Sequence, residues 1–275
     1  MARSRAIPAA ARDLCLAFPQ VEEFESHGSP NYRAKKGKVF AVWALNHHGD
    51  GHVALWLNTP AMEQSRLLAA PHVFKPPYVG PSGWIAVELN KGVSWKRVCE
   101  LVCMAYVNSS PKKLVATVSG PPKIAAPTVK MKPAEIDRLL APRAQKAVAA
   151  LREICASLPE TEEGRQMGSV AWRTRKRSFA MLHDYGKGLA VQFWVGIERQ
   201  GPLEMDPRFS IPPYLGHQGW MTLDLRKGFN ARELRELIIE SYRHFASRAR
   251  GSRSSEPRCL KRTVACRQRP SMASV

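Results

Sequence analysis

Two pairs of adjacent carboxylates and one group of histidines are the residues whose types and spacing could carry out acid–base or metal chemistry. The pairs are Glu22-Glu23 and Glu162-Glu163, and the histidines are His47, His48 and His52. Adjacent residues in a loop after a helix point apart, and these pairs lack the partner groups that general acid–base catalysis needs. We therefore expect solvated carboxylates, no catalytic residues and no enzyme activity.

The three histidines surround an expected hairpin turn, where a bound metal ion is one interpretation. The corresponding turn later in the chain reads His183-Asp184-Tyr185 and lacks the other two histidines. No glycine-rich phosphate loop, serine elbow or C-x-x-C pair occurs, so we expect no metal site, no cofactor and free thiols at the six cysteines.

Basic side chains cluster at the same expected hairpin in each half of the chain. A solvated turn is one interpretation, and a contact to nucleic-acid phosphates is the other, because hairpin tips can reach a duplex backbone or groove. The candidate residues at these two turns are Arg33, Lys35, Lys36, Lys38, Arg173, Arg175, Lys176 and Arg177.

A second repeated feature is the segment Pro-Pro-Tyr-x-Gly-x-x-Gly-Trp, at residues 76–84 and 212–220. Its prolines and glycines fix an extended entry and tight turns, and its aromatic rings are expected to cover a sheet. The alternative is a surface that binds a base or an apolar peptide by stacking. The residues of this alternative peptide- or protein-binding surface are Tyr78, Trp84, Tyr214 and Trp220.

These features recur because the chain is a tandem duplication. With an offset of 140 residues, Cys15, Pro19 and Gly28 match Cys155, Pro159 and Gly168. With an offset of 136 residues, the aromatic segments align without a gap. The change of offset falls near residues 37–51, where a hairpin connection tolerates a change of length.

The elements that must position these residues follow an α-β-β-β-α-β-α order in each copy. Apolar alternation predicts the strands, and prolines and capping residues such as Thr59-Pro60 and Ser94 predict where helices begin and end. The fold class is therefore α+β, as two tandem α-β(3)-α-β(1-2)-α domains, each with an antiparallel sheet packed by helices. In the first copy we expect helices at 9–17, 61–69 and from 95, and strands at 31–35, 39–45, 52–57 and 84–89, with a further short strand near 73–74.

The formal charge of +19 is unevenly distributed along the chain. Residues 1–110 and 151–250 each have a net charge of +4, whereas 111–150 have +6 and 251–275 have +5. We expect domains at 8–114 and 145–249, a basic Pro/Lys-rich linker at 115–144 and a basic disordered tail at 250–275. No apolar run is long enough for a membrane helix, which predicts a cytoplasmic protein without a membrane partner.

Several sequence pieces, in order, resemble the MmcQ/YjbR family. They are Phe18-Pro19 with Glu22-Glu23, His27-Gly28-Ser29-Pro30, Gly37-Lys38-Val39-Phe40-Ala41, the aromatic segment, and Ala105-Tyr106 followed by Pro111-Lys112-Lys113-Leu114. The resemblance implies a small α+β domain akin to the secretion-chaperone-like and CyaY-like folds.

The same resemblance implies DNA binding through a double-wing arrangement of hairpins. The wings are then the two basic turns, with Lys91 and Lys227 as assisting residues, and the expected partner is DNA, with a protein partner as the second expectation. The second copy departs from the pattern, since Arg177-Ser178 replaces Gly37-Lys38 and no Pro-Lys-Lys-Leu follows Tyr242. The two copies are therefore expected to differ in binding.

Overall fold

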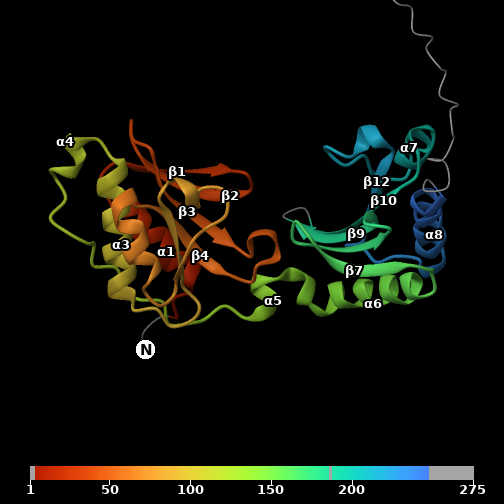
Figure 1. Cartoon of the computed structure of the whole chain (residues 1–275), viewed down its shortest axis with the longest axis horizontal. Coiled ribbons are helices and arrows are strands. Elements are labelled where there is room, and N and C mark those ends of the chain that lie inside the picture. The colour runs from red at the N-terminus through yellow and green to blue at the C-terminus, as the bar shows by residue number, and fades with distance from the viewer. Residues whose placement is uncertain (1–3, 186–187, 248–275) are drawn as a thin grey trace, which may run out of the picture.

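The computed structural model describes residues 4–185 and 188–247 and shows two domains of the same architecture (Figure 1). Each contains a six-stranded antiparallel sheet, with strand order β1-β2-β3-β4-β6-β5 in domain 1 and β11-β12-β10-β9-β8-β7 in domain 2. The α+β class, the duplication and the antiparallel sheet packed by helices are confirmed.

Domain 1 begins with helix α1 and ends with the long helix α3. Its helices and strands are α1 (Ile7–Leu16), β1 (Val21–Ser26), β2 (Ser29–Ala34), β3 (Val39–Leu45), β4 (Val53–Asn58), α2 (Gln64–Leu68), β5 (Val73–Phe74), β6 (Trp84–Glu88) and α3 (Trp95–Ser109). Three 3-10 turns separate them, η1 (His47–Gly49), η2 (Ala61–Glu63) and η3 (Gly80–Ser82).

Domain 2 repeats this order with longer helices. Its elements are α6 (Pro142–Ala156), β7 (Thr161–Gln166), β8 (Ser169–Thr174), β9 (Arg177–Tyr185), β10 (Gly188–Trp194), α7 (Ile197–Glu204), β11 (Phe209–Ser210), η5 (Gly216–Gln218), β12 (Trp220–Asp224) and α8 (Ala231–Ser247). Between the domains lie α4 (Lys112–Val115), α5 (Pro133–Ile136) and η4 (Arg138–Leu140).

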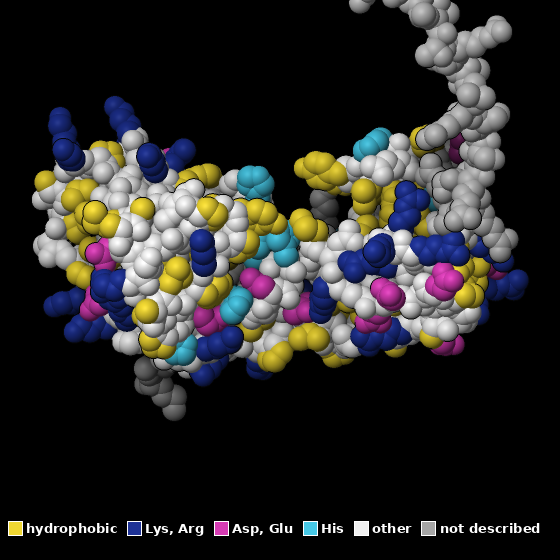
Figure 2. Space-filling view, in the orientation of Figure 1, with side chains coloured by type: hydrophobic (Ala, Val, Ile, Leu, Met, Phe, Trp, Pro, Cys, Tyr) yellow, Lys and Arg dark blue, Asp and Glu magenta, His cyan; other side chains and the backbone are white. Residues whose placement is uncertain are grey.

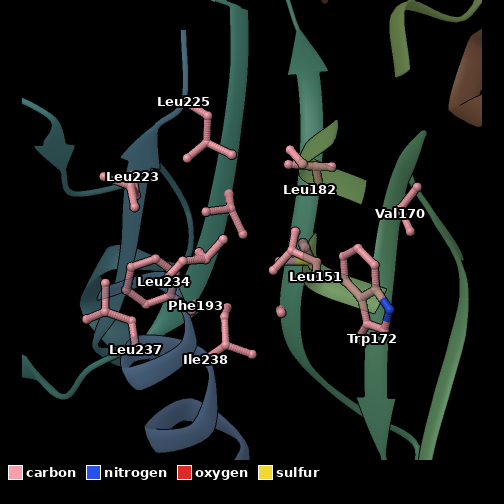
Figure 3. Close-up of a cluster of buried hydrophobic side chains, with 14 of the residues drawn as sticks. Leu151, Val170, Trp172, Leu182, Phe193, Leu223, Leu225, Leu234, Leu237 and Ile238 are labelled. Atoms are coloured by element: carbon pink, nitrogen blue, oxygen red, sulfur yellow. The ribbon is translucent and has the colours of Figure 1, made fainter. Parts of the chain in front are cut away.

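The core of each domain lies between one face of its sheet and its first and last helices. In domain 2, Leu151 of α6 and Leu234 and Ile238 of α8 pack with Trp172 and Phe193 from the strands (Figure 3). The period-two pattern of the strands and the apolar stripe of each helix place these side chains together. The same layering in domain 1 fixes where the turns between strands emerge.

The adjacent carboxylates are the first correction to the expected elements. Glu22-Glu23 and Glu162-Glu163 lie in edge strands β1 and β7, not in loops. An edge strand with one solvated face can carry charged side chains, which is why its apolar pattern is weak. Glu23 accepts hydrogen bonds from Arg12 and Tyr32, and Glu163 is paired with Arg152, so these carboxylates brace the strand against the preceding helix.

The expected helix at 61–69 is shorter and begins differently. Residues 61–63 form η2, and α2 starts at Gln64. Thr59 is not the cap: its hydroxyl is buried and donates to the Gly83 carbonyl at 3.0 Å. The expected cap Ser94 occupies the cap position of α3 without a side-chain hydrogen bond. Before α8, Asn230 does act as a cap, since its side chain accepts from the Arg232 and Glu233 amides.

The segment expected as a linker lies along domain 1. The Ile124 carbonyl accepts from the Trp95 indole at 2.9 Å, and Asn90 bonds to both backbone groups of Met131. Val118, Ile124, Met131 and Ile136 of this segment pack against the domain 1 core. Prolines did not prevent docking because extended segments can still bury their apolar side chains.

The two domains touch at a pair of turns. A Cβ built on Gly49 in the β3–β4 connection would lie 3.3 Å from the Gly168 Cα in the β7–β8 turn. Within residues 4–185 and 188–247, no helix combines the length and the apolar character needed to cross a bilayer. The expected tail, 250–275, lies outside the described residues.

Candidate nucleic-acid interface

The turn between β2 and β3 presents lysines to solvent at one end of the strands of the domain 1 sheet. Lys35, Lys36 and Lys38 are exposed, and Lys36 has a left-handed φ of 62°. The Lys35 amide donates to the Gln20 carbonyl at 2.9 Å and the Gly37 amide donates to the Ala34 carbonyl at 2.8 Å. These backbone bonds hold the turn, so its side chains are left to face water.

Two further lysines lie beside this turn because the chain leaving α3 crosses it. The Lys38 amide donates to the Ser109 carbonyl at 2.9 Å. A Cβ built on Gly37 would lie 3.0 Å from that oxygen and 3.3 Å from Pro111 Cδ, so the chain leaving α3 passes closely over Gly37. Helix α4 starts at Lys112, which brings the exposed Lys112 and Lys113 next to the turn.

We call the five residues Lys35, Lys36, Lys38, Lys112 and Lys113 the lysine face. Among the described residues, every ion pair is formed by arginine or histidine, and none involves these lysines. Figure 2 shows Lys and Arg side chains projecting from the end of domain 1 that carries α4. Five unneutralised charges on one end of a domain attract a polyanion.

The corresponding turn of domain 2 has arginines that are already engaged. Arg175 forms an ion pair with Glu160 at 3.0 Å, and Arg177 lies 5.8 Å over the Phe245 ring. Arg173 donates to the Arg165 carbonyl at 3.1 Å, and only Lys176 of this group has no partner among the described residues. In domain 1, Arg33 is likewise paired with Glu22.

Lys91 and Lys227 were expected to assist the basic turns. They lie at the opposite ends of the strands in each sheet. Ala41 pairs with Leu57 near the start of β3, whereas Leu45 pairs with Val53 at its far end, and the Leu89 amide donates to the Val53 carbonyl. At 3.4 Å per residue, the length of β3 separates the two ends of the strands by roughly 20 Å. The antiparallel register therefore removes these two residues from the candidate interface.

The two basic turns also face away from each other. Each basic turn lies at the end of the strands that is opposite to the Gly49–Gly168 contact. This is because the β3–β4 and β7–β8 turns, which make that contact, emerge at the other ends of the strands. Helix α4 marks one end of the molecule and α8 the other (Figure 1). One short duplex therefore cannot lie against both turns in this arrangement.

The aromatic segments do not form the four-residue surface expected as the alternative. Tyr78 and Tyr214 are 71% and 90% exposed, but Trp220 is 6% exposed and Trp84 is half-buried against Trp56 and Ala86. The tryptophans start a strand and pack on the sheet, whereas the tyrosines sit at left-handed φ angles of 61° and 66° and point outward.

The histidine turn divides into two unrelated contacts. His47 and His48 pack together with ring centroids 4.0 Å apart, and the Tyr78 hydroxyl is 3.1 Å from His48 Nε2. His52 instead lies 2.6 Å from Glu88. Within the described residues, no three His, Cys, Asp or Glu side chains are grouped in a way that could hold a metal ion.

Sequence reasoning missed Lys112 and Lys113 as members of the interface. The motif Pro-Lys-Lys-Leu directly after the last helix was a visible signal. It was placed at the end of the domain without a role, because only the crossing of Ser109 and Pro111 over the turn shows that these lysines join it.

The chain matches the family model described as YjbR over residues 16–108 and 156–244. Among solved structures, it is similar to a Deinococcus radiodurans protein with a DUF419 domain, at 23% identity and a TM-score of 0.34, over 37% of this chain and 80% of that one. A Pseudomonas syringae protein is similar at 18% identity and a TM-score of 0.30, over 37% of this chain and 97% of that one. No curated protein matches the chain. Since the two matched regions together span more than half of the sequence and coincide with the two domains, the chain belongs to the YjbR family.

Proposed function

We propose that this protein is a non-enzymatic DNA-binding protein and that the lysine face of domain 1 is its principal contact with DNA phosphates. The observation that carries the proposal is the gathering of five exposed lysines without carboxylate partners from two segments of the chain. Domain 2 has only a minor share, because most basic side chains of its turn are already held by other groups.

The chemistry of the lysine face fits the DNA backbone better than base edges. Lysine ammonium groups are flexible point charges, and they neutralise phosphates without the fork geometry by which arginine reads guanine. Binding is then independent of sequence and weakens steeply with salt, because each neutralised phosphate releases about 0.9 of a counterion.

A salt series on the full chain with a short duplex tests the proposal. Reversing the turn, as K35E/K36E/K38E, is expected to lower affinity at least about tenfold at low salt and to reduce the slope of log K against log salt by about 3. The variant K112E/K113E is expected to reduce the slope by about 2, because α4 lies beside the same turn.

The matched control reverses three lysines elsewhere, as K91E/K96E/K227E. Lys91 and Lys227 lie at the ends of the strands that are far from the basic turns, and Lys96 lies in the first turn of α3, away from Ser109. This variant has the same net charge as the first. Equal loss of binding in the two variants would mean that overall charge, and not the lysine face, attracts DNA.

A further inference from the structure

The residue directly before the first strand is a glutamine in domain 1 and a glutamate in domain 2, although the backbone there is the same in both domains. Gln20 and Glu160 follow equivalent prolines and have left-handed φ angles of 53° and 50°. The hydroxyl of Tyr106 donates to the Pro19 carbonyl at 2.8 Å, and that of Tyr242 donates to the Pro159 carbonyl at 2.9 Å. The last helix therefore holds both turns in the same way.

This place lies beside the first basic residue of each hairpin turn. Val21 pairs with Ala34 and Thr161 pairs with Thr174, so Gln20 is adjacent to Lys35 and Glu160 is adjacent to Arg175. The Glu160 carboxylate accepts from Arg175 Nε at 3.0 Å. Gln20 has an uncharged amide there, and Lys35 has no carboxylate partner among the described residues.

We propose that position 20 in domain 1 and position 160 in domain 2 set how strongly each basic turn engages DNA. The carboxylate of Glu160 pairs with the Arg175 guanidinium, which would otherwise be available to bind a phosphate. It also adds a negative charge beside the DNA contact. Gln20 does neither. This inference rests on the proposed function, since it names what makes the two copies unequal at the same surface.

The Glu160–Arg175 ion pair also borders a groove on domain 2. Glu160, Arg175, Tyr242 and Arg243 line a groove of about 370 Å³ at the end of α8. Arg243 is exposed and has no partner among the described residues. In domain 1 the same place has Val107 for Arg243, and Pro111 lies over Gly37. With Glu160 replaced, two guanidinium groups border a groove large enough for a phosphate.

The test uses the full chain with all five residues of the lysine face reversed, as K35E/K36E/K38E/K112E/K113E, so that domain 2 dominates the remaining binding. Adding Glu160→Gln is expected to raise affinity for a short duplex about two- to fivefold at low salt, the range of an exposed charge pair. It is expected to steepen the salt slope by about 0.9, the effect of one additional phosphate contact. The control Glu162→Gln removes an equal charge from an exposed residue that has no arginine partner.

The reciprocal change, Gln20→Glu in the otherwise unaltered chain, is expected to weaken binding about two- to fivefold, while Gln20→Asn leaves it unchanged. Equal effects of Glu160→Gln and Glu162→Gln would overturn the inference. If K35E/K36E/K38E itself binds like the unaltered chain, the proposed function fails instead, so the two failures are distinguishable.

Discussion

At the scale of single residues, pairing decides what a charge can do. Arg33 and Glu22 face each other across β1 and β2, and Arg175 and Glu160 meet across the corresponding turn of domain 2. Such exposed pairs stabilise a fold by about 0–1 kcal/mol each, but they remove a cation from any phosphate contact. The lysine face has no such pairs, and this difference is what separates it from the arginine-rich turn.

A prediction at this scale concerns Cys15 and Cys155, which are equivalent and buried. Burial raises the pKa of the Cys15 thiol well above its usual range and, with a smaller contribution from Glu163, raises the pKa of Cys155 to about 12. At pH 8 the thiolate fraction of Cys155 is then about one in ten thousand. Both thiols should resist iodoacetamide in the native protein and react after unfolding, as read by mass spectrometry of peptides.

Cys103 is the internal comparison for that experiment, since it is only half-buried. Burial raises its pKa as well, but without complete enclosure. It is expected to be alkylated earlier than Cys15 and Cys155 over the same time course. Native labelling of Cys15 at the rate of Cys103 would contradict the packing assigned to α1.

At the scale of elements, one glutamine in each copy joins the short helix to the aromatic segment. Gln200 on α7 donates to the Gly216 and Trp220 carbonyls, both at 2.8 Å, and Gln64 donates to the Gly80 and Trp84 carbonyls at 2.7 and 2.8 Å. The exposed tyrosine of each segment lies two residues before the first of these two carbonyls. The glutamine therefore positions the loop from which Tyr78 or Tyr214 projects.

Replacing Gln200 by Met is expected to destabilise the protein by about 2–4 kcal/mol, because two buried carbonyls lose their donor. Gln64→Met should cost less, since Gln64 is only half-buried and water can replace its amide. Urea denaturation measures both. Gln192→Met, on a half-exposed position of β10, is the control, and an equal loss in the control would show that the two hydrogen bonds contribute nothing.

At the scale of the whole molecule, the histidine turn of domain 1 is a contact with domain 2. The backbone of His48 and Gly49 meets Gly168, and both glycines have φ near +80°. The second domain is further tied to the preceding segment by the Arg165–Asp137 ion pair at 2.6 Å. This contact holds the two basic turns at opposite ends, so avidity on a single short duplex is not expected.

Gly49→Asn is expected to separate the domains, because asparagine tolerates a left-handed φ but its side chain would press on Gly168. Gly51→Asn is the matched control, with a φ of +72° and nothing within 4 Å of its built Cβ. Small-angle scattering should show a larger radius of gyration for the first variant alone. Identical scattering from both variants would contradict the contact.

Much of the fold follows from the sequence by itself. Repeated residues at fixed offsets determined the duplication, and period-two and helical patterns determined the α+β order, including the short strand at Val73–Phe74. Strands β1 and β7 were missed because carboxylates at solvated edge positions hide the apolar alternation. Position along the chain was enough to place the basic turns at hairpin tips.

Only the tertiary structure decided which charges are available and which lie together. Lys91 follows β6 in sequence, but antiparallel pairing places it at the end of the strands that is far from the β2–β3 turn. Lys112 and Lys113 are far along the chain from Lys36, yet they lie beside that turn. Ion pairing likewise depends on what another strand brings within reach, as Glu160 does for Arg175. Local patterns set the elements because they act between near neighbours, and the interface forms between residues that are neighbours only after folding.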